Sequence, residues 1–105
     1  MASRYVNWDS EEIFNHEILQ IAVKKLLPPN GEQTPLSQKR MALYRNMMIE
    51  GDKVPLINVE YDSTKIRDGY HRYRAYLELL KISPEYPDVI PVRRWKRIFN
   101  SKEKL

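Results

Sequence analysis

The stretch that decides the fold runs through a glycine turn into a helix: Ile66-Arg67-Asp68-Gly69-Tyr70-His71-Arg72-Tyr73-Arg74-Ala75-Tyr76. Residues 65–67 predict a short strand, and Gly69 allows a sharp turn directly after it. Helical spacing continues over residues 70–81, where the predicted buried stripe is Tyr73, Tyr76, Leu77 and Leu80. The first turn of such a helix has free backbone N–H groups at the positive end of its dipole. The stretch therefore predicts a binding site for anions, phosphate above all.

The side chains of this turn favour the same ligand. Gly69 has no Cβ to keep a phosphate oxygen away. Arg72 can hold phosphate in a two-pronged contact, and His71 can donate a hydrogen bond, or a proton when charged. A plainer interpretation stays open, in which Asp68 caps an ordinary helix and pairs with Arg72.

Further elements follow in both directions from this turn. Residues 54–61 predict a strand, turned by residues 62–64 and therefore antiparallel to residues 65–67. A helix is expected from Thr34-Pro35 to Glu50-Gly51, and a strand over residues 18–23 before a proline loop at 28–35. The apolar face of the helix that begins at Thr34-Pro35 is predicted to consist of Leu36, Leu43, Tyr44, Met47 and Met48.

The two ends of the chain complete the predicted order. Residues 89–92 predict a last strand, and a short helix is expected to begin at Glu11. Arg74 and Glu78 are expected to pair on the exposed side of the second long helix. The order of the main elements is strand, helix, strand, strand, helix, strand, which predicts an α+β fold.

Length and composition limit the possible classes. The 105 residues fit one domain, which we divide into an N-terminal segment (1–17), a folded domain (18–95) and a basic tail (96–105). The absence of cysteine excludes disulfides, thiolate catalysis and cysteine-based metal sites. His16 and His71 lie far apart, so no metal site is predicted. No apolar run is long enough for a membrane span or a signal peptide, and a cytoplasmic location is expected.

Positive charge gathers in the last fifteen residues, which carry six basic side chains against Glu103 alone, a net charge of +5. Such a segment attracts phosphate-rich partners, so the candidate nucleic-acid contacts are Arg93, Arg94, Lys96 and Arg97. Trp95 within this run suits stacking on an unpaired base, or packs inward from a strand. The alternative interpretation of the whole segment is a solvated basic tail.

Several of these motifs occur together in the order found in one known group of proteins. Residues 54–59, 66–76 and 90–92, with residues 21–29 upstream, resemble the ParB N-terminal domain and sulfiredoxin superfamily over about residues 18–95. The resemblance implies a small domain in which helices pack on a mixed sheet. It also implies that the turn binds the phosphates of a nucleoside triphosphate, CTP or ATP. Magnesium is the expected companion because it screens those phosphates.

The resemblance assigns roles only where positions match. Gly69, His71 and Arg72 match the phosphate-binding motif, and Lys39 matches a family lysine that contacts nucleotide. Asn46 stands where sulfiredoxin has a hydroxyl residue and can still form a hydrogen bond. Tyr70 stands where sulfiredoxin needs its cysteine, so sulfiredoxin chemistry is excluded. Tyr70 is instead a candidate for stacking on a base, or part of the core.

ParB proteins also carry a helix-turn-helix domain after this fold, for which a chain of this length has no room. Sequence-specific DNA binding of the centromere type is therefore not expected.

Three functions remain open. The first is a nucleotide-binding enzyme, either a hydrolase or a phosphotransferase, with His71, Asp68 and Glu32 as candidate catalytic residues. The second is a DNA- or RNA-binding module or nuclease of a plasmid or phage type, acting through the basic C-terminal segment. The third is an interaction protein without catalysis, and a homodimer is compatible with all three. The alternative interpretation of the carboxylates is that Asp68, Glu32 and Glu60 have only ordinary roles in loops and helix caps.

Overall fold

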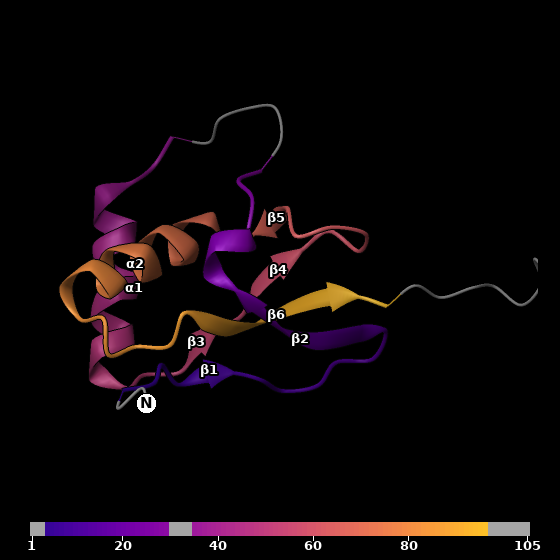
Figure 1. The fold of residues 1–105 in the computed structure, drawn as a ribbon, viewed down its shortest axis with the longest axis horizontal. Helices are drawn as coiled ribbons and strands as arrows, with labels where there is room; N and C mark the ends of the chain where they lie inside the picture. Colours follow the sequence, from indigo (N-terminus) through magenta and orange to yellow (C-terminus); the bar gives the residue numbers. More distant parts are fainter. Residues whose placement is uncertain (1–3, 30–34, 97–105) are drawn as a thin grey trace, which may run out of the picture.

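The computed structural model describes residues 4–29 and 35–96. Its helices are α1 (Gln38–Glu50) and α2 (Tyr70–Ile82), with a short 3-10 helix, η1, at Val23–Lys25. Its strands are β1 (Trp8–Asp9), β2 (His16–Ala22), β3 (Val54–Pro55), β4 (Ile57–Val59), β5 (Ile66–Asp68) and β6 (Val89–Trp95). The helices lie at one end of the molecule, and the main sheet extends away from them (Figure 1).

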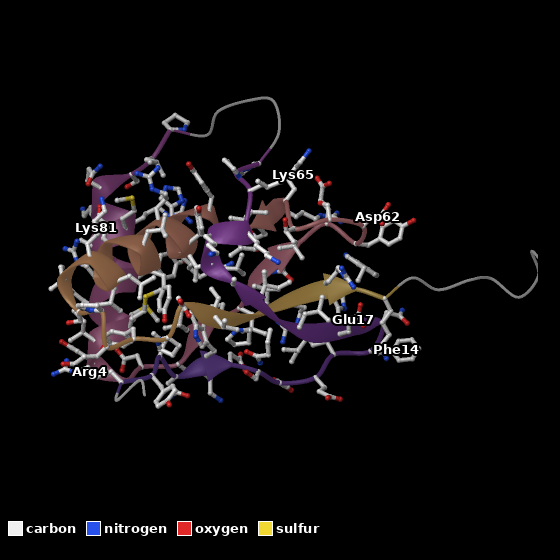
Figure 2. All side chains as sticks on the ribbon, viewed as in Figure 1. Arg4, Phe14, Glu17, Asp62, Lys65 and Lys81 are labelled. Carbon is white, nitrogen blue, oxygen red and sulfur yellow. The ribbon has the colours of Figure 1, made fainter. Side chains whose placement is uncertain are left out.

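The main sheet has four strands in the order β2-β6-β4-β5. β6 is antiparallel to β2, from His16 opposite Trp95 to Ala22 opposite Val89, and parallel to β4. β4 and β5 are antiparallel, as the tight connection predicts. The first and last predicted strands exist and are longer than expected, because each supplies hydrogen-bond partners for the other. Glu17 lies in β2 at the end of this pair that points away from the helices, and Phe14 is close to that end (Figure 2).

The single strand predicted over residues 54–61 is wrong. Leu56, which is fully buried, separates β3 from β4, and the two strands join different sheets. β3 pairs in parallel with β1, with Trp8 opposite Val54. The helix predicted from Glu11 is wrong as well, because residues 10–13 have no regular secondary structure and residues 14–15 form a turn before β2.

Helix α1 begins later than predicted and ends where predicted. Thr34 lies outside the described residues, Pro35 precedes the helix, and Ser37 is the N-cap, whose Oγ accepts from the N–H of Arg40 at 3.1 Å. At the other end Gly51 has φ +81°, and its N–H donates to the last carbonyls of the helix. This left-handed cap is the role that the sequence predicts for glycine.

The core lies between the helices and the sheet. Tyr76 and Leu79 of α2 pack with Met48 of α1 and with buried side chains of β4 and β6, which removes apolar surface from water. The predicted face of α1 is only partly right. Met48 is buried and Tyr44 and Met47 pack against the core, whereas Leu43 is 56% exposed, and the buried Met41 was not predicted.

The expected pair between Arg74 and Glu78 is not formed. Glu78 instead binds Arg45 of α1 at 2.6 Å, so the ion pair joins the two helices.

One contact outside the named strands positions the proline loop. Leu27 forms a parallel bridge with Lys65, with hydrogen bonds of 3.0 Å to Thr64 and 2.8 Å from Ile66. The chain after Leu27 therefore runs beside β5 and brings Pro28 and Pro29 to the start of α2. Across residues 4–29 and 35–96, neither helix has the length and apolar character of a membrane span.

Candidate phosphate-binding site

The turn between β5 and α2 is formed by Gly69 alone. Its φ of +100° and ψ of 25° are left-handed, a conformation that residues with a Cβ adopt only under strain. No side chain caps α2, so Asp68 does not have the capping role of the plainer interpretation. The first-turn N–H groups of α2 are therefore free of a side-chain cap, at the positive end of a 13-residue helix.

Arg72 lies over this turn and is almost buried, with 8% of its surface exposed. Its guanidinium is 5.6 Å from the ring centre of Tyr44, and one terminal nitrogen is 3.4 Å from an Asp68 carboxylate oxygen. Its Nε is buried and has no hydrogen-bond partner within the described residues. Buried polar atoms are normally paired, and a buried charge without full pairing is costly. Arg72 therefore has one donor, Nε, that the described residues leave unpaired, and an anion is the kind of partner that suits it.

The position of the Arg72 side chain depends on the absence of a Cβ at Gly69. A Cβ at Gly69 would lie 2.7 Å from a terminal nitrogen of Arg72 and 2.9 Å from its Nε. The guanidinium of Arg72 thus occupies the space that a side chain at Gly69 would fill. From the sequence we predicted that a phosphate oxygen would use this space, whereas in the structure Arg72 uses it.

His71 joins the two helices. It is 7% exposed, and its Nε2 accepts the backbone N–H of Ser37 at 3.0 Å. The proton of the neutral ring must then be on Nδ1. Burial, with a smaller contribution from the charge of Arg40, lowers the pKa of His71. In this arrangement Nε2 is an acceptor that fixes the start of α1 against α2, and it is not free to donate to a ligand.

A hollow of about 230 Å³ opens at this junction. We call it the phosphate hollow; it is lined by Pro29, Arg40, Tyr44, Arg67, Asp68, Gly69, Tyr70, His71 and Arg72. Three arginines face a single carboxylate, so its lining has a net positive charge that favours anions. The site draws on β5, both helices and the proline loop, and the Leu27 bridge brings the loop into place.

The structure brings only some of the candidate ligand residues together. Lys39 and Asn46 are exposed on α1 and do not belong to the lining, whereas Arg40 does. The site residues predicted from the sequence did not include Arg40 or Arg67. Consecutive helical residues differ by about 100° in direction, so an error of one position selects another face. The signal that could have found Arg40 is the start of α1 at Ser37, which points the first turn toward α2.

The other candidate catalytic residues have different positions. Asp68 lines the hollow with a side chain that is 73% exposed, and Glu32 lies outside the described residues. Within the described ranges, no group of three or more acidic or histidine side chains is arranged to hold a metal ion.

The candidate nucleic-acid residues serve largely internal contacts. Arg93 donates to the backbone carbonyls of Glu11 at 2.5 Å and Asp9 at 3.5 Å, and Arg94 binds Glu17 at 2.9 Å. Both belong to β6 and not to a tail.

The remaining members of that segment differ among themselves. Trp95 is 43% exposed and packs on the ring of His16 at 4.4 Å between centres. Lys96 is exposed after β6, and Arg97 with the rest of the predicted tail lies outside the described residues.

Comparison with known proteins adds one finding. No protein-family model matches the chain, and no curated protein matches it. A solved structure of a Pnob8-like ParB-N domain superposes on 85% of the chain with a TM-score of 0.59. The chain has the fold of a ParB-N domain. The ParB-like α+β fold expected from the sequence is thereby confirmed, and sequence identity is 13%.

The likeness concerns part of a longer protein. The superposed region is about a third, 32%, of the Pnob8-like chain. At this level of identity the ParB-N likeness establishes how the backbone is arranged. The chemistry of the site is argued from the side chains described above.

Proposed function

We propose that this domain binds a nucleotide and holds its phosphates in the phosphate hollow. The observation that carries the proposal is Arg72, a nearly buried guanidinium with an unpaired Nε beside uncapped N–H groups of α2. Phosphate accepts several hydrogen bonds at once and suits both the arginine fork and the helix end. Arg40 and Arg67 in the same lining favour a ligand with more than one negative charge.

A nucleoside triphosphate, CTP or ATP, is the ligand that best combines these features with a ParB-like fold. Magnesium fits the donor set in a limited way. In nucleotide sites Mg²⁺ is bound by one or two carboxylates together with phosphate oxygens. Asp68 is the carboxylate in the lining and would be its protein ligand. Bound there, magnesium would supply charge that offsets the phosphates.

The geometry supports binding better than turnover. Asp68 is 3.4 Å from Arg72, and Nε2 of His71 is engaged by Ser37. Hydrolysis and phosphoryl transfer therefore remain predictions of the sequence. The nucleic-acid alternative has weaker support, because Arg93 and Arg94 are committed to contacts within the domain.

The test is calorimetric titration of the protein with CTP, ATP and GTP, each with magnesium. We expect at least one to bind, and Arg72→Met to abolish binding while the apolar stem keeps most of the packing. Arg4→Met is the matched control, because Arg4 is an exposed arginine that pairs with Glu85. Figure 2 shows Arg4 on the opposite side of the molecule from Lys65, the residue just before β5. Arg4 is therefore far from the phosphate hollow.

Each outcome decides the proposal. Loss of binding in Arg72→Met with full binding in Arg4→Met supports it. Equal affinity of the folded Arg72→Met variant and the parent places any nucleotide elsewhere. Absence of binding by all three nucleotides removes the proposal.

A further inference from the structure

A second and larger hollow, of about 530 Å³, lies next to the phosphate hollow. We call it the tyrosine groove: it runs between Pro28 and the face of α2 that carries Tyr70, Tyr73 and Leu77. The two hollows share Tyr70, and the adjacent residues Pro28 and Pro29 each line one of them. Tyr70 therefore stands at the border of the two hollows.

The wall of the groove is a preformed aromatic surface. The rings of Tyr70 and Tyr73 are 6.0 Å apart at their centres and inclined by 24°, a stacked arrangement. Arg74 lies 6.0 Å from the Tyr70 ring centre and donates to the Tyr70 hydroxyl at 3.3 Å. Both rings are half-buried, so a flat ligand can reach them without a rearrangement of the core. Aromatic side chains with one accessible side are common stacking surfaces for nucleobases.

The polar side chains around the groove can form hydrogen bonds with the edge of a base. Glu78 lines the groove and is held by Arg45 of the neighbouring helix. Lys81, at the helical end of the molecule in Figure 2, and Arg74 supply hydrogen-bond donors. The mixture of both charges with aromatic and aliphatic side chains is typical of a site for a polar aromatic ring.

We propose that the tyrosine groove binds the nucleoside part of the ligand, with its base against Tyr70. This inference rests on the proposed function, because the phosphate hollow must hold the other end of the same molecule. It adds the position of the base, since the proposed function places only the phosphates. Tyr70 then acts at both hollows, since it separates the charged end of the ligand from the flat end.

The experiment compares two ligands that share phosphates and differ in the base. The protein is titrated with inorganic tripolyphosphate and with CTP and ATP, all with magnesium. Tripolyphosphate has at least the charge of the nucleotides, so tighter binding of a nucleotide measures the nucleoside contact. We expect a preference of about tenfold or more, as one base–aromatic stack provides. Tyr70→Leu should remove most of that preference. Because Tyr70 lines both hollows, the readout is the ratio of nucleotide affinity to tripolyphosphate affinity within the variant, in which any change at the phosphate hollow cancels.

Two further variants protect this test from a folding artefact. Tyr70→Phe keeps the ring and should keep the preference. Tyr5→Leu removes a tyrosine that is 67% exposed outside both hollows, and it should behave like the parent.

The results separate the two proposals. Equal affinity for tripolyphosphate and nucleotides refutes the groove while the phosphate site stands. A nucleotide preference that persists in folded Tyr70→Leu also refutes it, since the base then lies elsewhere. Failure of every ligand, tripolyphosphate included, overturns both proposals.

Discussion

Gly69→Ala tests the turn at the centre of the site. At φ +100° an alanine is strained by about 1–2 kcal/mol. Its Cβ would also lie 2.7 Å from the Arg72 guanidinium, which must move and lose its contacts with Asp68 and Tyr44. A cation–π contact of this kind is worth about 0.5–1 kcal/mol or more. We therefore expect a total destabilisation of about 2–3 kcal/mol.

Gly51→Ala is the matched control, because Gly51 has φ +81° and no atom within 4 Å of the added Cβ. It should incur the backbone strain alone. Urea unfolding of both variants isolates the contact with Arg72 as a difference of about 1 kcal/mol, or ~4–8 °C in Tm for a domain of this size. Nucleotide affinity should fall only in Gly69→Ala. Equal destabilisation of the two variants, with unchanged affinity in both, would refute the steric link between Gly69 and Arg72.

Three other perturbations have defined outcomes. Burial lowers the pKa of His71 in the folded protein below its ordinary value of 6.5, so the unfolded chain takes up a proton at a higher pH than the folded one. The stability that the neutral His71 contributes is therefore fully present above about pH 6.5 and is lost as the pH falls through the folded-state pKa. His71→Gln keeps an acceptor for Ser37 and should show a flatter decline in urea-unfolding free energy over this range; an identical slope would contradict the assignment. A double-mutant cycle on Arg45 and Glu78 should give a coupling energy of roughly 0.5–1 kcal/mol, since both side chains are about a third exposed; zero coupling would show that the pair is incidental. Arg93→Met should cost about 1.5–3 kcal/mol and accelerate amide exchange in β1, because two carbonyls of the N-terminal segment lose a charged donor; unchanged exchange would show that β1 is held by other contacts.

Local signals predicted the parts of the fold that local physics determines. Helix α2 was expected over residues 70–81 and spans Tyr70–Ile82, because its apolar spacing and the glycine before it agree. Of its predicted stripe only Tyr76 is fully buried; the other three side chains are partly buried at the edge of the core. The end of α1 at Gly51 follows from the same kind of signal. No local signal predicted the break at Leu56, because the residues on both sides of it have the pattern of a strand. Only the pairing of β3 with β1 shows that the chain passes from one sheet to the other there.

The site was predicted in outline and missed in detail. Gly69 and Arg72 are together because they are neighbours in the turn. Arg40 joins them through the packing of two helices, which depends on where α1 begins and on the bond between Ser37 and His71. Contacts between distant segments of this kind are set by tertiary geometry, and a single sequence carries little information about them.

The position of β6 has a consequence for how the protein is made. β6 is the last described strand to be synthesised, yet it lies between β2 and β4 and pairs with both. Until residue 95 has left the ribosome, β2 and β4 lack their shared neighbour, and the sheet has no centre. The nascent chain must therefore carry β2 without its partner β6 through most of its synthesis, a period in which an exposed edge can bind other chains.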